Sequence, residues 1–150
     1  MNIAFYIDEM NVRGVANSTY DYAKYNKLIL NNNSYIFYNK KNFRNKIHVL
    51  RRFKKRFKVI GISNFREIDN FLESHKLNYV YTQKSGNKDE WVSKKIKTII
   101  HSVYPQLLSQ IHGYKYFYIS EWLSYNFSNN KIPSLPYIVE KNYIKQNLKR

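Results

Sequence analysis

The sequence predicts an α/β fold in which a mainly parallel sheet is flanked by helices. Short β-like runs alternate with helical patterns along the chain, and polar or turn-forming residues separate them. The length of 150 residues suffices for one domain with a hydrophobic core. The 43% of hydrophobic and 17% of aromatic residues exclude a disordered chain. We expect one domain over residues 1–139 and a basic tail over residues 140–150.

Six apolar runs have the length and composition of strands, and most are rich in Val, Ile, Tyr or Phe. In chain order they are Asn2–Ile7, Tyr35–Tyr38, Phe57–Ile62, Tyr79–Thr82, Lys97–Val103 and Tyr116–Ile119. Helical patterns separate several of them, and such crossovers join parallel strands. The expected arrangement is therefore a single Rossmann-like domain.

Capping patterns mark the beginnings of the helices between these runs. Ser18 is expected to cap the first helix, with Asp21 three residues later as an acidic partner. Asn64 and Glu67 repeat this spacing before the fourth strand, and a short helix is expected over residues 121–127. These helices would cover both faces of the sheet.

Other structural classes are disfavoured by simple absences in the sequence. No apolar run approaches the roughly 20 residues that a membrane span needs. The short apolar run at the start lacks a basic segment before it, so we do not expect a signal peptide. We therefore expect a cytoplasmic location. There is no cysteine, so disulfides and thiolate chemistry are excluded. Residues 83–89 and 105–114 are expected to be loops, and residues 129–136 an exit linker.

The charge of the chain is its most unusual property. Twenty-six Lys and Arg against ten Asp and Glu give +16, which favours anionic partners such as phosphates, acidic glycans, nucleic acid or anionic lipid. An A/T-rich coding sequence would also raise lysine, together with asparagine, isoleucine and tyrosine. The composition leaves both explanations open.

Ten of the cations lie in residues 40–58, which contain no acidic residue. Four apolar residues with helix-like spacing predict an amphipathic helix over much of this segment: Phe43, Ile47, Leu50 and Phe57. Its outward face would offer four basic side chains to a polyanion or an anionic membrane surface: Arg51, Arg52, Lys54 and Lys55. A merely solvated basic face is the alternative.

The turn after the first strand is the first candidate binding site. Ligands of open parallel sheets bind outside the carboxyl ends of the strands, where a helix amino end suits an anion. Gly14 would allow close backbone approach and Arg13 would supply a donor fork, with Asn17 and Ser18 opening the helix. A plain turn and cap is the alternative for these residues.

The end of the fifth strand supplies the second candidate. His101, followed by Ser102, should lie at the same edge as Gly14 and Ser18, where an imidazole could bind a sugar hydroxyl or accept a proton. Glu121, after the sixth strand, could line the same cleft. A core histidine and a helix-end carboxylate are the alternatives. The scattered histidines predict no metal site, and no cofactor is expected.

Three stretches together resemble the amino-terminal, acceptor-side domain of retaining GT-B glycosyltransferases. The stretches are residues 2–29 with Arg13-Gly14 and Asn17-Ser18, residues 99–103 with His101-Ser102, and residues 112–139 with His112-Gly113, Ser120-Glu121-Trp122 and Pro136-Tyr137. The resemblance spans nearly the whole chain and about half of such an enzyme. It implies an acceptor-side domain. His101 is the candidate catalytic residue because of its place at the end of the fifth strand.

This resemblance implies a glycan or lipid-linked acceptor as ligand. Because the family places the donor nucleotide mainly on a second domain, we expect a truncated or split enzyme, completed by a donor-binding partner subunit or inactive in transfer. The alternative is a basic nucleic-acid- or polyanion-binding module that uses residues 40–58. No nucleic-acid-binding motif supports that alternative beyond the charge.

Overall fold

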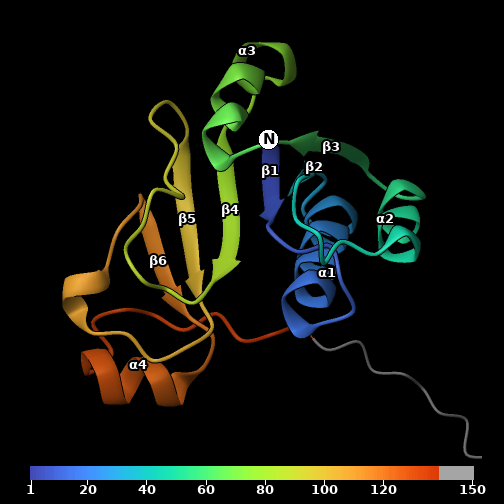
Figure 1. Cartoon of the computed structure of the whole chain (residues 1–150). Coiled ribbons are helices and arrows are strands. Elements are labelled where there is room, and N and C mark those ends of the chain that lie inside the picture. The colour runs from blue at the N-terminus through green and yellow to red at the C-terminus, as the bar shows by residue number, and fades with distance from the viewer. Residues whose placement is uncertain (139–150) are drawn as a thin grey trace, which may run out of the picture.

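The computed structural model describes residues 1–138 and contains a six-stranded, entirely parallel sheet (Figure 1). The order across the sheet is β3-β2-β1-β4-β5-β6. The strands are β1 (Asn2–Ile7), β2 (Asn33–Asn39), β3 (Lys58–Ile62), β4 (Tyr79–Lys84), β5 (Lys97–Ser102) and β6 (Lys115–Tyr118). The α/β, Rossmann-like prediction is confirmed.

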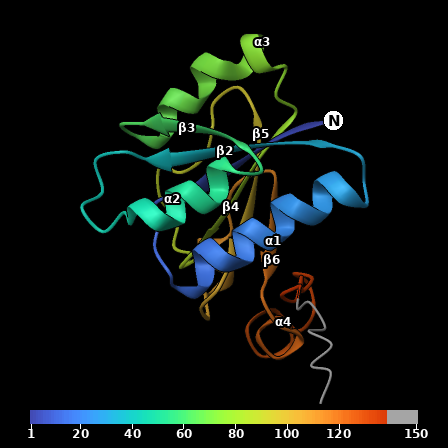
Figure 2. The same ribbon diagram turned by 90° about the vertical axis from the view of Figure 1, so that its right-hand side faces the viewer.

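Helices cover both faces of the sheet. The helices are α1 (Gly14–Leu28), α2 (Ile47–Lys54), the 3-10 helix η1 (Phe65–Phe71), α3 (Leu72–His75), the short 3-10 turn η2 (Leu108–Gln110) and α4 (Glu121–Ser128). Figure 2 shows α1 and α2 together in front of the sheet, while η1 and α3 pack on the other face. The last helix, α4, lies beside β6.

The core is split in two by the sheet, as the two-residue period of a strand requires. In β1, Phe5 and Ile7 are buried in the cluster under α1 and α2, while Ala4 and Tyr6 are buried in the cluster under η1. Central parallel strands are covered on both faces, so they carry apolar side chains at successive positions. This explains why β1 reads as a continuous apolar run.

The first helix begins earlier than its capping pattern predicted. It starts at Gly14 with Arg13 as the N-cap residue, and no side chain caps it. Ser18 lies in the second turn and is buried, so the prediction that it caps the helix was wrong. Its hydroxyl accepts a hydrogen bond from Gln83 Nε2 at 2.8 Å. The Ser18 hydroxyl therefore bonds a residue of β4, whereas the local sequence pattern had predicted that it caps the helix.

The basic segment 40–58 is less helical than expected. Only Ile47–Lys54 is α-helical, and the side chains that anchor it are Val49 and Phe53, followed by Phe57. Phe43 is 87% exposed and Ile47 is 62% exposed, so the predicted stripe was wrong at these positions. Because residues 40–46 form a loop that contacts the β1–α1 loop, the helix starts too late to bring Phe43 inward.

The segment after Asn64 begins where predicted but takes a tighter form. Asn64 is the N-cap residue of η1, although its side chain does not cap the helix. Glu67 reaches back across the start of η1, but its carboxylate accepts hydrogen bonds from Ser63 N and Asn64 Nδ2, at 3.0 and 3.2 Å, and not from the Asn64 backbone N–H of a capping box. Phe65 and Ile68 are buried.

The segment after α4 packs back on the sheet. Tyr118 N donates to Pro133 O at 3.0 Å, and Leu135 N donates to Tyr118 O at 2.7 Å. Tyr22 Oη, on α1, donates to Pro136 O at 2.6 Å. The predicted exit linker therefore crosses the carboxyl end of β6 towards α1. The predicted tail, residues 140–150, lies outside the described residues.

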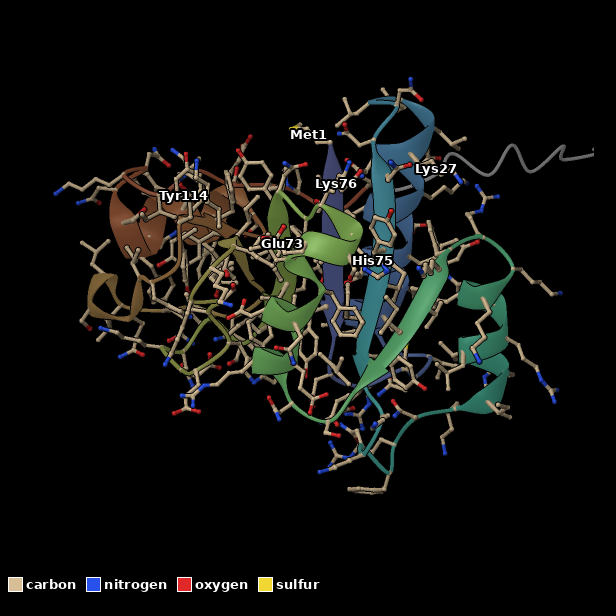
Figure 3. All side chains as sticks on the ribbon, turned by 90° about the horizontal axis from the view of Figure 1, so that it is seen from above. Met1, Lys27, Glu73, His75, Lys76 and Tyr114 are labelled. Carbon is tan, nitrogen blue, oxygen red and sulfur yellow. The ribbon has the colours of Figure 1, made fainter. Side chains whose placement is uncertain are left out.

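The strand order of the parallel sheet reverses at one point, and all strands end at one common edge. The strands β1, β2 and β3 step outwards in one direction, and β4, β5 and β6 step outwards in the other, so the order reverses between β1 and β4. Figure 3 looks onto the amino edge, where Met1, Lys76 and Tyr114 lie. The carboxyl edge is on the far side of that view.

The helices within residues 1–138 include none with the length and apolar composition of a membrane span.

Candidate functional site

A crevice of about 620 Å³ opens at the carboxyl edge between β1 and β4. This is the topological switch point of the sheet, where ligands of open α/β folds bind. Its lining comes from the loop after β1, the start of α1, the end of β4, the loops after β4 and β5, and Tyr137 near the end of the described chain. We call this hollow the β1/β4 crevice. Its main polar and aromatic residues are Asp8, Glu9, Asn11, Arg13, Gln83, Lys84, Asp89, Trp91, Tyr104 and Tyr137.

Two carboxylates on the β1 side of the crevice are held in place by amide side chains. Asp8 accepts hydrogen bonds from Asn39 Nδ2 at 3.0 Å and from Asn42 Nδ2 at 2.9 Å. Glu9 accepts one from Asn11 Nδ2 at 2.7 Å and one from Arg44 at 2.8 Å. Both side chains are partly exposed. The β1 side of the crevice therefore presents two oriented acceptor groups.

A buried cation forms the opposite wall. The Lys84 side chain is only 3% exposed, and its Nζ pairs with an Asp89 carboxylate oxygen. The Trp91 ring lies 5.6 Å from Nζ. Burial lowers the pKa of Lys84, while the Asp89 carboxylate opposes that change. The ammonium group therefore sits at the crevice wall with one charged partner and little water.

His112 contacts the same ammonium group from the β5–β6 loop. Its Nε2 lies 3.1 Å from Lys84 Nζ, and its Nδ1 lies 2.7 Å from Gln110 O. Because an ammonium group only donates, Nε2 must accept, so the ring is neutral and Nδ1 carries the hydrogen. Burial lowers the pKa of His112, which fits this neutral form. His112 thus orients Lys84.

The charge of the crevice differs from that of the chain as a whole. Among the described residues, the lining brings together three carboxylates and two cations: Asp8, Glu9, Asp89, Arg13 and Lys84. The whole sequence carries +16. Three aromatic residues, Trp91, Tyr104 and Tyr137, add ring surfaces to the same lining. Such a mixed lining suits a polar, weakly charged ligand better than a polyanion.

His101 does not line the crevice, contrary to the prediction that it would lie in it. It is fully buried on the α1 side of the sheet. Its Nδ1 lies 2.6 Å from Tyr81 Oη and 3.1 Å from Gln83 Nε2. Gln83 is also a crevice residue and also donates to Ser18 Oγ. Ser18 and His101 therefore share Gln83 as a hydrogen-bond partner, but both lie behind the crevice wall and not in the crevice where they were predicted.

The interior position of His101 sets its protonation state. Burial lowers its pKa to about 4, and the nearby Leu135 carbonyl only partly opposes this. Because the Gln83 amide nitrogen donates towards Nδ1, that atom accepts and Nε2 carries the hydrogen. Among residues 1–138, Nε2 has no well-formed hydrogen bond. A neutral, enclosed ring of this kind organises the wall rather than taking a proton from a ligand.

The remaining predicted binding residues divide into two groups. Arg13 and Gly14 line the crevice. Asn17 instead donates to Val12 O at 3.0 Å and accepts from Arg52. Ser102 is fully buried, and its hydroxyl contacts Ser85 O and Tyr104 O at 3.1 and 2.8 Å.

Glu121, the last predicted binding residue, is also absent from the lining. It is exposed in the first turn of α4, beside β6. Because the crevice lies at the switch point between β1 and β4, its lining includes Arg13 and Gly14 of the predicted set. It does not include the other predicted residues, which are Asn17, Ser18, His101, Ser102 and Glu121.

The four basic residues of the predicted polyanion surface are exposed on α2 and at its C-cap residue, Lys55. Arg52 also contacts α1, because its guanidinium lies 4.1 Å from the Tyr20 ring centre and donates to Asn17 Oδ1 at 2.7 Å. This side chain joins α1 to α2.

Sequence reasoning missed the β4 side of the crevice. The fourth strand was expected to end at Thr82, and Gln83–Asp89 was treated as a loop, whereas Gln83 and Lys84 belong to β4. A signal was present, because a Gln-Lys pair directly follows a buried apolar run in the position where a parallel strand meets its ligand. If the predicted fourth strand had been extended by two residues, it would have included Gln83 and Lys84.

No metal centre accompanies the crevice: within residues 1–138, no three His, Asp or Glu side chains gather closely enough to hold an ion. Comparison with known proteins adds no identification. No protein-family model, no curated protein and no solved structure matches the chain.

Proposed function

We propose that this chain is a glycosyltransferase-like acceptor-side domain that binds a neutral, hydroxyl-rich ligand, such as an acceptor sugar, in the β1/β4 crevice. The observation that carries the proposal is the lining of the crevice. Oriented carboxylates, amides and one buried ammonium group surround a hollow of about 620 Å³ that also contains aromatic rings. The resemblance of the sequence to acceptor-side domains points to the same class of ligand.

Hydroxyl groups both donate and accept hydrogen bonds, so they can satisfy all the polar groups of this lining at once. Asp8 and Glu9 would accept from ligand hydroxyls, and Lys84 would donate to a ligand oxygen. Trp91 and Tyr104 would contact the apolar face of a sugar ring. A nucleotide or polyanion would instead meet three carboxylates, at a cost in repulsion that the two cations would only partly offset.

The proposal is tested by ligand-detected NMR with glucose, galactose and N-acetylglucosamine as neutral probes and UDP as the anionic probe. We expect binding of at least one neutral sugar that UDP does not displace. Lys84→Met should weaken that binding about tenfold or more, because it removes a charged hydrogen-bond donor. Lys88→Met is the matched control, since Lys88 is exposed on the loop that follows β4 and lies outside the lining.

A second variant keeps the test valid if Lys84→Met destabilises the fold. Gly14 lies at the crevice, and a Cβ at this position would meet no other atom within 4 Å. Gly14→Val should therefore preserve folding and narrow the crevice, which reduces sugar binding. Binding of UDP alone, or sugar binding that neither variant changes, would contradict the proposal.

A further inference from the structure

Three large apolar side chains project outwards beside the crevice. Val12 is 65% exposed, Phe43 is 87% exposed and Ile47 is 62% exposed. Val12 and Phe43 line a small surface hollow of about 300 Å³ together with Arg13, Arg44 and Lys46. Ile47 directly follows Lys46 as the first residue of α2. We call these six residues, three apolar and three basic, the apolar–basic tip.

The backbone of the tip is held by polar contacts, which keep the apolar side chains outside the core. Lys46 N donates to Met10 O at 2.7 Å, and Met10 N donates to Asn45 Oδ1 at 2.8 Å. Asn45 Nδ2 also donates to Asn39 O at 2.8 Å. These bonds join the β1–α1 loop to the β2–α2 loop. The exposure of the apolar side chains is therefore built into the fold.

The basic residues of the tip retain a positive surplus. Arg44 pairs with Glu9 at 2.8 Å, and Arg13 lies 3.9 Å from the same carboxylate. One carboxylate thus faces two guanidinium groups, and Lys46 adds a third cation. The Arg44 guanidinium also lies 5.4 Å from the Phe43 ring centre. The neighbouring Lys40, Lys41 and Arg51 are exposed as well.

We infer that the apolar–basic tip docks on an anionic lipid bilayer. Exposed apolar side chains encircled by Lys and Arg enter the interface between headgroups and acyl chains, while the cations bind lipid phosphates. A nucleic acid would use the charges and the Phe43 ring, but Val12 and Ile47 offer no aromatic face for stacking. The combination of aliphatic and basic side chains therefore favours lipid.

Docking through the tip would also orient the crevice. Arg13 lines both the small hollow of the tip and the β1/β4 crevice, so the two openings are adjacent at the carboxyl edge. A bilayer bound at the tip would lie beside the mouth of the crevice. The inference goes beyond sugar binding and does not depend on it, because docking needs only the exposed tip.

The test is sedimentation of the full chain with phosphatidylcholine vesicles and with vesicles that contain roughly one-third phosphatidylglycerol. We expect binding to the anionic vesicles only, weakened about tenfold when salt rises from roughly 0.1 to 0.5 M. The triple variant Val12→Ser, Phe43→Ser and Ile47→Ser should lower the partition coefficient about tenfold or more. Since these side chains are exposed, the variant should unfold at the wild-type temperature.

The matched control changes three apolar residues at the opposite edge of the sheet. Leu28, Ile29 and Leu30 are 60%, 72% and 63% exposed and follow Lys27 at the amino edge (Figure 3). Their replacement by Ser should leave vesicle binding unchanged. Equal loss in both triple variants, or no loss in either, would overturn the inference. So would retention on DNA without vesicle binding. If the tip triple variant fails to fold, Phe43→Ser alone decides the same question.

Discussion

The two halves of the sheet are connected in different ways. In the half formed by β1, β2 and β3, each crossover contains a helix whose apolar face packs on the sheet. In the half formed by β4, β5 and β6, the crossovers are residues 85–96 and 103–114. These residues, all within the described part of the chain, contain no helix beyond the short turn η2.

Side-chain to backbone hydrogen bonds replace helix packing in the second half. Tyr116 Oη donates to Gly86 O at 2.9 Å, Tyr118 Oη donates to Gln106 O at 2.5 Å, and Ser102 Oγ contacts Ser85 O. All three polar side chains belong to strands and reach into the loops. A polar residue near a strand end can therefore serve to hold a loop, which is why Ser102 resembled a binding residue in the sequence.

The largest loss of stability is expected in the half of the sheet formed by β1, β2 and β3, on which the helices pack. Phe53 is fully buried in α2, and its ring lies 5.0 Å from that of Tyr20. Phe53→Ala should lower the free energy of unfolding by about 4 kcal/mol, because it leaves a cavity between α2 and the sheet. Urea denaturation measures this value. A loss below about 1 kcal/mol would show that α2 contributes little to the core.

In the half of the sheet formed by β4, β5 and β6, we expect the largest loss of stability from a substitution at Gly86. Its φ is +97°, and a Cβ there would overlap Ser102 Oγ and approach Tyr116 Oη. Gly86→Ala should cost about 3–4 kcal/mol, since it combines backbone strain with steric conflict. The same urea titration provides the measurement. Wild-type stability would mean that the loop contacts are not needed.

Among the histidines, His101 should make the largest contribution to the pH dependence of stability. Its pKa is about 4 in the fold and 6.5 without burial, so between these values the unfolded chain binds a proton that the folded chain does not. Stability therefore falls as the pH drops from about 6.5 to 4, by up to roughly 3 kcal/mol. Unfolding free energies at several pH values should decline less in His101→Gln than in the wild type. Identical slopes would contradict the burial of a neutral ring.

A smaller loss is expected when a single loop contact is removed. Tyr118→Phe keeps the buried ring and removes the hydroxyl that donates to Gln106 O. The expected cost is about 1–2 kcal/mol, because a partner carbonyl loses its hydrogen bond. Tyr125 is 62% exposed, so Tyr125→Phe serves as the control. Thermal unfolding of the two variants should separate them by several degrees.

The smallest change in the free energy of unfolding is expected at Gly14, where a substitution should stabilise the fold. A Cβ at this first residue of α1 meets nothing within 4 Å, and its φ lies outside the left-handed region. Gly14→Ala should stabilise the fold by up to about 1 kcal/mol, because it restricts the unfolded chain. A destabilisation as large as that of Gly86→Ala would remove the contrast between the two glycines.

The sequence by itself determined the α/β class and the order of the strand-forming runs, because apolar runs of strand length separated by helical patterns are local features of the chain. It also identified Arg13 and Gly14 as crevice residues, because the turn after the first parallel strand must face the carboxyl edge. Both conclusions depend only on neighbouring residues and on strand direction.

The tertiary structure alone decided the rest of the crevice. The strand order placed β4 beside β1, which brought Lys84 opposite Asp8. The side chains of His101 and Ser102 at the end of β5 are buried outside the lining. Long-range hydrogen bonds assigned Ser18 and His101 to the interior, although both are polar. The bonds of Gln83 to Ser18 and to His101 join residues 65 and 18 positions apart, and such contacts leave no periodic signal in the chain. Their geometry is fixed only when the sheet assembles.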